Sequence, residues 1–457
     1  MRTIDVAALL NRAKLNSFHT SLLLWSALII IFDGYDLVIY GVVLPSLMKD
    51  WGLSALQAGL LGSCALLGMM VGALTFGSLS DRIGRRKAIT TCVVLFSGVT
   101  FINGFARSPE EFALCRFIAG IGIGGVMPNV IALMNEYSPN RLRGRLISII
   151  FAGYAVGGMI SAALGMLLIP TWGWSSVFFV AAVPLFVLPL LVRQLPESIN
   201  FLLRKGRIHS AQLLLQKAEP SYTPLPDDAF HLEAGQAPKV SIVQIFQDGR
   251  LTNTLLLWLA FCCSLLMIYG ISAWLPKLMS TAGYGINSSI GFLLVLNFGA
   301  ILGSLFGGWL ADRFGLGRVL LCFLVVSSLV LSLMAVKAPL PVLYALIAIA
   351  GGGTFGAQIL ANAFAVQYYP AHIRSTGLGW AMGIGRIGAI TGPMLGAAIH
   401  GAELPMEFSF LAFAIPGLIG ASAIGVFQIR AKRNAQPEMD SQVVKTFQST
   451  TPSSLDV

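Results

Sequence analysis

The stretch GSLSDRIGRRK (residues 77–87) decides the fold because it occurs twice in the chain. It returns as GWLADRFGLGR (residues 308–318), at an offset of 231 residues. The same offset relates Leu44-Pro45 to Leu275-Pro276, Gly68 to Gly299, Gly72 to Gly303, Gly120 to Gly351, Gly125 to Gly356, Pro139 to Pro370 and Arg143 to Arg374. So many ungapped matches indicate two copies of one ancestral unit, which fold alike.

The composition places both copies in a membrane. Of 457 residues, 56% are hydrophobic and 11% are charged, whereas a soluble domain carries about 25% charged residues. About 20 consecutive apolar residues suffice to cross a bilayer as a helix. Twelve such segments occur, near 21–47, 55–79, 88–106, 111–135, 146–169, 175–192, 251–275, 287–310, 318–336, 341–366, 376–399 and 408–429. We therefore expect an all-α polytopic membrane protein with twelve transmembrane helices in two six-helix, pseudo-symmetric bundles.

The polar stretches between these segments set the expected domain boundaries. They predict an N-terminal tail (1–20), a six-helix bundle (21–192), a linker (193–250), a second six-helix bundle (251–430) and a disordered tail (431–457). Within the linker, Ser198–Lys217 has the pattern of an amphipathic helix lying on the membrane surface. Because six is an even number, both bundles run in the same direction through the membrane. Parallel halves with a binding site between them near the midplane are typical of secondary transporters.

The net charge of +10 reflects membrane topology. Of 30 Lys and Arg residues, 24 fall on the side of the membrane that holds the two termini. The positive-inside rule therefore predicts that both termini are cytoplasmic, and it removes the reason to expect a nucleic-acid partner. All six cysteines lie within the predicted spans, and their spacing fits no zinc or haem pattern, so we expect no metal or cofactor.

Three motifs carry a resemblance to a known family. The loop 77–87 resembles the signature loop of the major facilitator superfamily, and RFIAGIGIGG (116–125) resembles its second motif. FDGYDLVIYG (32–41) is similar to the hallmark of the aromatic acid:proton symporter family. Its continuation through Val42-Val43-Leu44-Pro45 looks most like bacterial benzoate transport proteins.

The resemblance implies a major facilitator fold and a function. That function is proton-coupled import of a small aromatic carboxylate, of the benzoate or hydroxybenzoate type, by alternating access. It also implies a bacterial inner-membrane location, with the substrate, protons and the lipid bilayer as partners, and a functional monomer.

Asp33 and Asp36 are the candidate proton-coupling residues. Asp33 is 12 residues into the first span, hence about 18 Å deep at 1.5 Å per residue. A spacing of three puts both carboxylates on one helix face. An ionised Asp at that depth costs at least about 2.5–3.5 kcal/mol, so it requires an aqueous cavity or a cation. The alternative is a structural pair neutralised by arginine.

Arg116 and Arg386 are the basic residues inside predicted spans and the first candidates for substrate binding. A guanidinium can bind a carboxylate with two parallel hydrogen bonds. Either arginine can instead neutralise Asp33 or Asp36, and for Arg116 the motif of the superfamily favours that structural role. Further candidates for a ring-bearing anion are polar or aromatic residues within the spans, namely Tyr35, Asn129, Asn297, Gln358, Asn362, Phe355 and Trp380.

The duplicated loop predicts a cytoplasmic gate. The expected gate residues are Asp81, Arg82, Arg85, Arg86, Glu136, Arg143 and Asp312. Asp81 is expected to cap a helix of the other half, near 376, while Arg82, Arg85 or Arg86 meets Glu136. Topology alone explains the basic residues 85–87 equally well.

Two other functions compete with import. Export of aromatic or drug-like compounds by proton antiport is disfavoured because the segment Gly153–Gly158, which resembles an antiporter motif, lacks the expected proline. A membrane enzyme or sensor is disfavoured because the sequence offers no nucleophile–base constellation, no metal-spaced histidine cluster and no soluble signalling domain.

Overall fold

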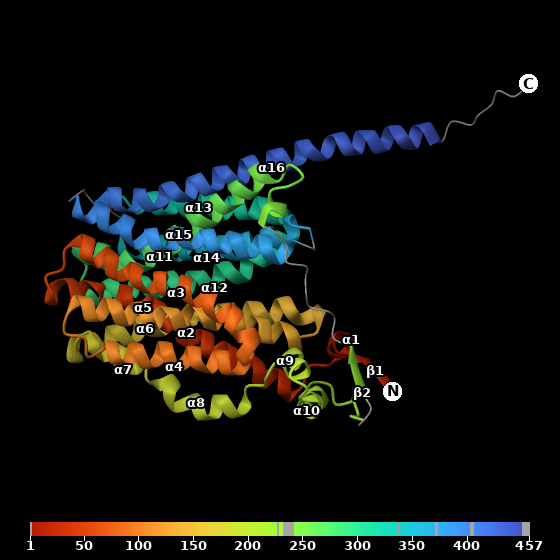
Figure 1. The fold of residues 1–457 in the computed structure, drawn as a ribbon. Coiled ribbons are helices and arrows are strands. Elements are labelled where there is room, and N and C mark those ends of the chain that lie inside the picture. The colour runs from red at the N-terminus through yellow and green to blue at the C-terminus, as the bar shows by residue number, and fades with distance from the viewer. Residues whose placement is uncertain are drawn as a thin grey trace, which may run out of the picture.

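The computed structural model describes residues 2–225, 228–231, 242–336, 338–370, 373–402 and 406–449. Its helices form two bundles, one stacked on the other (Figure 1). The first consists of α2 (Ser17–Asp50), α3 (Ala55–Ile83), α4 (Arg85–Asn103), α5 (Pro109–Tyr137), α6 (Asn140–Trp172), α7 (Ser175–Val180) and α8 (Val183–Gln194). The second consists of α11 (Leu251–Thr281), α12 (Ile286–Phe314), α13 (Leu316–Leu333), α14 (Leu340–Tyr368), α15 (Arg374–Gly401) and α16 (Met406–Ser449).

The helices agree with the expected polytopic all-α fold. Within the described residues, eleven segments are long and apolar enough to cross a membrane, with α7 and α8 together forming one of them. The segment predicted near 88–106 corresponds to α4, which is not among the eleven. Its first turn is Arg85-Arg86-Lys87, which lowers its mean hydropathy. It nevertheless packs along α5 within the first bundle.

Three predicted boundaries differ from the structure. The span near 175–192 is broken between α7 and α8, where Pro184 has no backbone N–H to continue the helix. The amphipathic helix expected over 198–217 is two helices, α9 (Ile199–Arg204) and α10 (Ile208–Ala218). Between them Gly206 has a φ of +68°, which ends the first helix. Finally, α16 continues past residue 430, where we expected a disordered tail, and ends at Ser449.

The N-terminal tail forms a small unit that the sequence did not predict. Strand β1 (Arg2–Asp5) pairs in parallel with β2 (Asp228–His231) from the linker, and helix α1 (Val6–Arg12) follows β1. The Asp228 carboxylate accepts a hydrogen bond from the Tyr222 hydroxyl at 2.7 Å and lies 3.4 Å from Nε of Arg2. The start of the chain is therefore bound to the segment that joins the two bundles. A 3₁₀ turn at Ile242–Ile245 precedes α11.

The duplication is visible in the helix packing. A Cβ on Gly68 would overlap the carbonyl oxygen of Phe117, and a Cβ on Gly299 would overlap that of Ala348. Both pairs are related by the same offset, as are the crossings of Gly72 with Ile121 and of Gly303 with Gly352. These glycines let α3 cross α5, and α12 cross α14, with the backbones in contact.

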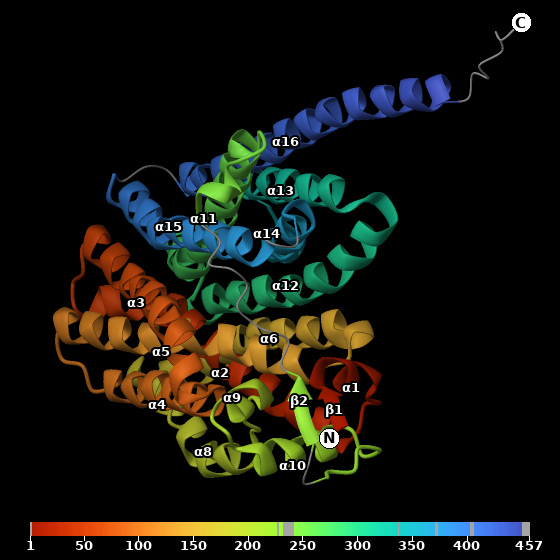
Figure 2. The ribbon, with the colours of Figure 1, turned by 45° about the vertical axis from the view of Figure 1, so that its right-hand side comes forward.

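The two bundles meet through α3 with α15, α6 with α12 and α2 with α11 (Figure 2). Several contacts between the bundles lie near the end where α2 ends and α3 begins. There the Ser63 hydroxyl donates to the carbonyl oxygen of Ile390 at 2.7 Å, and Gly59 abuts Ala397. One buried apolar cluster at this end combines residues of both bundles, including Leu44 and Trp274. This end of the molecule is therefore closed by packing.

Candidate functional site

Asp33 and Asp36 are both buried in α2, with exposed fractions of 2% and 1%, but their surroundings differ. Asp36 Oδ1 accepts a hydrogen bond from the Thr100 hydroxyl of α4 at 2.7 Å and lies 3.3 Å from Nη1 of Arg116 in α5. The same Nη1 donates to the backbone oxygen of Asp36 at 3.0 Å. Asp36, Thr100 and Arg116 thus form a buried ionic triad inside the first bundle.

Asp33 instead lines a cavity between the two bundles. Oδ1 of Asp33 is buried and has no hydrogen-bond partner within the described part of the chain. Residues of α2, α3, α5 and α6 form one side of the cavity, and residues of α11, α12, α14 and α15 form the other. Asp33 therefore faces the interface between the two bundles.

Arg386 lies in this same cavity, together with Gln358 and Asn362 of α14. The side-chain oxygens Oε1 of Gln358 and Oδ1 of Asn362 are buried without a hydrogen-bond partner in the described residues. Buried polar atoms are normally paired. Three buried oxygen atoms without a hydrogen-bond partner, in one cavity with a guanidinium, indicate a binding site for a polar group.

The remaining walls of the cavity are apolar and aromatic. The rings of Tyr154 and Phe355, one from each bundle, have centroids 6.2 Å apart. The cavity has a volume of about 140 Å³. A protein cavity of roughly 150 Å³ holds one benzene molecule. The site therefore matches an aromatic ring in size, and the Arg386 guanidinium offers a cation that can bind a carboxylate.

Five predicted substrate residues lie outside the cavity lining, namely Arg116, Tyr35, Asn129, Asn297 and Trp380. The Tyr35 hydroxyl donates to the carbonyl oxygen of Val177 at 2.6 Å. The amides of Asn129 and Asn297 donate back to their own helices, each at 2.8 Å. Trp380 is 42% exposed and stacks on Trp258. Arg116 is engaged by Asp36, which is the structural role considered from the sequence.

The structure adds cavity residues that the sequence did not indicate, including Ser304, Met127 and Met382. A signal for some of them was present in the repeat. Four pairs of cavity residues are related by the offset of 231, namely Leu37 and Ile268, Met127 and Gln358, Phe151 and Met382, and Ala155 and Arg386. Applying the offset to Arg386 or Gln358 would have identified the partner positions in the first half.

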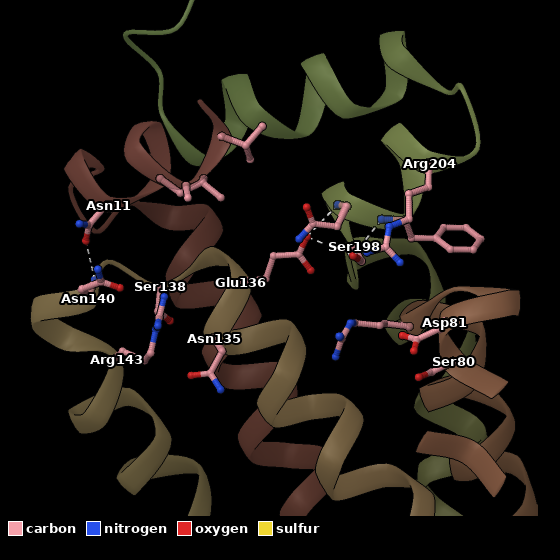
Figure 3. A pocket seen from close by; sticks show the side chains of 16 residues that line it. Asn11, Ser80, Asp81, Asn135, Glu136, Ser138, Asn140, Arg143, Ser198 and Arg204 are labelled. Carbon is pink, nitrogen blue, oxygen red and sulfur yellow. Dashed lines mark hydrogen bonds between the residues drawn. The ribbon is translucent and has the colours of Figure 1, made fainter. Parts of the chain in front are cut away.

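The expected gate residues lie at the end of the molecule opposite the closed layer, which is the buried cluster around Leu44 and Trp274. Asp81, Arg85, Glu136 and Arg143 line one pocket of about 500 Å³. In Figure 3, Asp81 and Arg143 lie on opposite sides of Glu136. Arg82 and Arg86 line a neighbouring groove, and Asp312 is exposed at the end of α12. The structure thus brings four of the seven gate residues together.

Glu136 has partners other than those expected. Its Oε1 accepts hydrogen bonds from the Ser198 hydroxyl at 3.1 Å and from the backbone N–H of Asn200 at 2.9 Å (Figure 3). Among the described residues it forms no ion pair with Arg82, Arg85 or Arg86. In this structure Glu136 therefore holds the start of α9 against α5, because its carboxylate accepts hydrogen bonds from two donors at that helix end.

The architecture defines a multi-pass helical membrane protein of two homologous bundles around a small, charged cavity. The sequence matches the Major Facilitator Superfamily over residues 26–303 and 287–451, and the chain belongs to this family. It is 43% identical to the benzoate transport protein of Acinetobacter baylyi, over 98% of each chain. It is 34% identical to the gentisate transporter of Corynebacterium glutamicum, over 87% of this chain and 85% of that one.

Solved structures agree on the fold. A D-xylose–proton symporter superposes with a TM-score of 0.69 at 17% identity, covering 89% of this chain and 97% of that chain. A bacterial homologue of the human lysosomal transporter Spinster superposes with a TM-score of 0.67 at 18% identity, covering 91% and 98%. The major facilitator fold expected from the motifs is therefore confirmed.

Proposed function

We propose that this protein imports a small aromatic carboxylate of the benzoate or hydroxybenzoate type together with protons. The observation that carries the proposal is that Asp33 and Arg386 line the same ring-sized cavity between the two bundles. The benzoate and gentisate transporters to which the chain is similar support this class of substrate.

Arg386 receives the substrate carboxylate in this proposal. An anion entering a site of low dielectric constant needs a nearby cation, and a guanidinium offers two parallel donors. The amides of Gln358 and Asn362 supply further donors, and Tyr154 and Phe355 form walls against the ring. Arg116 is not available for this role because Asp36 engages it.

Charge balance in the cavity explains coupling to protons. Ionised Asp33 and Arg386 together carry no net charge, and a bound carboxylate adds one negative charge. Protonation of Asp33 restores neutrality, so substrate and proton are bound most favourably together. Asp33 is therefore the coupling residue, and Asp36 supports it by fixing α4 and α5 against α2.

We propose that the protein lies in the inner membrane of a bacterium, is active as a monomer and has both termini in the cytoplasm. The excess of Lys and Arg at the end that holds the termini supports this orientation. The closed layer around Leu44 and Trp274 then faces outward. We infer that the structure is inward-facing and that transport exchanges this closed end for closure at the Asp81 loop.

Uptake into proteoliposomes tests the proposal. Labelled benzoate is offered with and without an imposed inward proton gradient, and unlabelled hydroxybenzoates, muconate and shikimate are added as competitors. We expect accumulation only with the gradient, and competition by the aromatic acids alone. Gradient-driven extrusion of benzoate would support the antiport alternative, and no gradient-dependent movement would reject both.

A further inference from the structure

A large basic groove lies beside the first bundle, on the surface away from the cavity. It has a volume of about 1820 Å³ and runs between the start of α4, the end of α8 and the helices α9 and α10. In Figure 1, α8 leads along the outer edge of the bundle to α9 and α10, at the end that holds the N-terminus. With the orientation proposed above, this is the cytoplasmic surface of the membrane.

The first cations of the groove come from the transmembrane helices. Arg82 is in the last turn of α3, Arg86 and Lys87 are in the first turn of α4, and Arg193 is in the last turn of α8. Positions at the ends of spans place these side chains at the level of lipid head groups. They form no ion pair within the part of the chain that the structure describes.

The opposite wall of the groove belongs to the linker. It contributes Lys205 and Arg207 from the turn between α9 and α10, and Lys217 from the last turn of α10. One acid, Glu197, lies among these seven cations, and its Oε1 accepts from the backbone N–H groups of Arg86 and Ser198. The groove therefore carries a large excess of positive charge, which suits an anionic occupant.

An apolar groove continues from the basic one toward the membrane interior. It has a volume of about 520 Å³, and Leu24, Trp25 and Leu28 of α2 line it. Both grooves share Ser17, Ser21 and Gln194. The Trp25 indole N–H donates to Oε1 of Gln194 at 2.8 Å at this junction, and Leu24 is 64% exposed.

We propose that the two grooves together bind an anionic phospholipid. The basic groove holds the phosphate-bearing head group, and the strip along Leu24, Trp25 and Leu28 holds one acyl chain. A basic pocket at the cytoplasmic level of transmembrane helices is suited to anionic head groups. The apolar continuation favours a lipid over a free anion, because an inorganic ion has no apolar part to bind along Leu24, Trp25 and Leu28. None of the groove residues lines the transport cavity, although Arg82 and Arg86 belong to the loop that is proposed to close during transport.

Fluorescence quenching by brominated lipid tests this site in the intact protein. The full chain is reconstituted in phosphatidylcholine that contains about one-tenth brominated phosphatidylglycerol, or the same fraction of brominated phosphatidylcholine. The contribution of Trp25 is obtained by difference from the Trp25→Phe variant. We expect the brominated phosphatidylglycerol to quench Trp25 several-fold more effectively, because each cation near an anionic head group favours binding by about fivefold.

Charge variants separate the groove from general surface attraction. The triple change Arg193→Gln, Lys205→Gln and Arg207→Gln should remove the preference for phosphatidylglycerol. The matched triple Arg141→Gln, Arg145→Gln and Arg318→Gln neutralises three exposed cations outside the groove and should preserve it. Equal quenching by the two lipids in the unmodified protein would overturn the proposal, as would a preference that survives the first triple. Loss of the preference in millimolar inorganic phosphate at constant ionic strength would also overturn it, in favour of a free anion.

Discussion

The two bundles share one backbone plan but differ in the chemistry of their interiors. In the first bundle, Asp36, Thr100 and Arg116 form the buried ionic triad. The offset of 231 maps these positions onto the second bundle as Met267, Leu331 and Ile347, which are buried in an apolar cluster. The same packing problem thus has an ionic solution in one copy and an apolar solution in the other.

The cavity shows the opposite division. There the first bundle presents Met127 and Ala155, where the second presents Gln358 and Arg386. Asp33 is the acidic exception in the first bundle, and its counterpart in the second is Ser264. Under the proposed mechanism, the duplicated scaffold assigns proton coupling to the first copy and substrate binding to the second.

The largest effect is expected at the ionic triad of the first bundle. We expect Arg116→Ile alone to destabilise the protein by about 3–5 kcal/mol, because it leaves the buried Asp36 charge without its partner. The triple change Asp36→Met, Thr100→Leu and Arg116→Ile copies the second bundle and should recover most of that loss. Thermal unfolding of the purified protein in detergent measures both. A single variant as stable as the unmodified protein would show that the triad has no structural role.

Asp33→Asn should abolish proton-driven accumulation, with a loss of at least about 100-fold, since the amide binds no additional proton at any working pH. Exchange of labelled for unlabelled substrate without a gradient should persist, because it needs no net proton movement. Ser264→Ala, at the matched position of the second bundle, is the control and should accumulate substrate normally. Normal accumulation by Asp33→Asn under an imposed gradient would rule out its coupling role.

Arg386→Ala should weaken substrate affinity by about 10- to 100-fold, the range expected for a lost charge-assisted hydrogen bond. The affinity of Arg386→Lys should lie between those of the unmodified protein and Arg386→Ala, because an ammonium does not reproduce the planar fork of a guanidinium. Equilibrium binding of labelled benzoate to purified protein measures both, with Arg313→Ala outside the cavity as the control. If Arg386→Lys keeps its affinity and shifts only the pH dependence of uptake, Arg386 balances Asp33 and does not contact the substrate.

Gln358→Met copies the matched residue of the first bundle into the second. It removes one neutral hydrogen-bonding group from the cavity and should weaken affinity by about 2- to 10-fold. Met127→Leu, a change of similar size on the apolar side, should leave affinity within about twofold. The same binding measurement decides, and equal effects of the two substitutions would contradict a polar role confined to the second bundle.

The smallest expected effect is at the gate. Asp81 lies far from the cavity, so Asp81→Asn should slow turnover by about two- to fivefold, the scale of one helix-capping charge, with unchanged affinity. Initial rates of uptake and equilibrium binding on the same preparation separate these quantities. Reduced affinity at an unchanged rate would place Asp81 in the binding site instead.

Much of this architecture follows from the sequence alone, because the membrane spans and the repeat depend only on the order of residues along the chain. Apolar length predicts the helices, and the offset of 231 predicts which of them are equivalent. Sequence also identified Asp33 and Arg386, since charged residues at membrane depth are rare and costly. Spacing also predicted that Asp33 and Asp36 share one helix face, but the structure directs Asp36 toward Thr100 and Arg116 and Asp33 toward the cavity.

What the sequence left open depends on neighbours that only the three-dimensional packing supplies. Adjacent positions on a helix face different helices, so the spacing of Asp33 and Asp36 did not reveal that Arg116 engages one of them and the cavity the other. In the same way, Asn129 and Asn297 resemble Gln358 in chemistry and depth. Their amides bond to the carbonyl one turn earlier, which no sequence pattern indicated.

The pairing of β1 with β2 has a consequence for biosynthesis. Arg2 is aligned with Asp228, so during translation β1 stays unpaired until a partner strand 226 residues further along the chain has been synthesised. At translation rates of about 5–20 residues per second, that wait lasts roughly 10–45 seconds. The whole first bundle is inserted during this interval while the N-terminus is still unpaired. A fusion partner placed before Arg2 would compete with this late pairing, whereas one placed after Val457 would leave it unaffected.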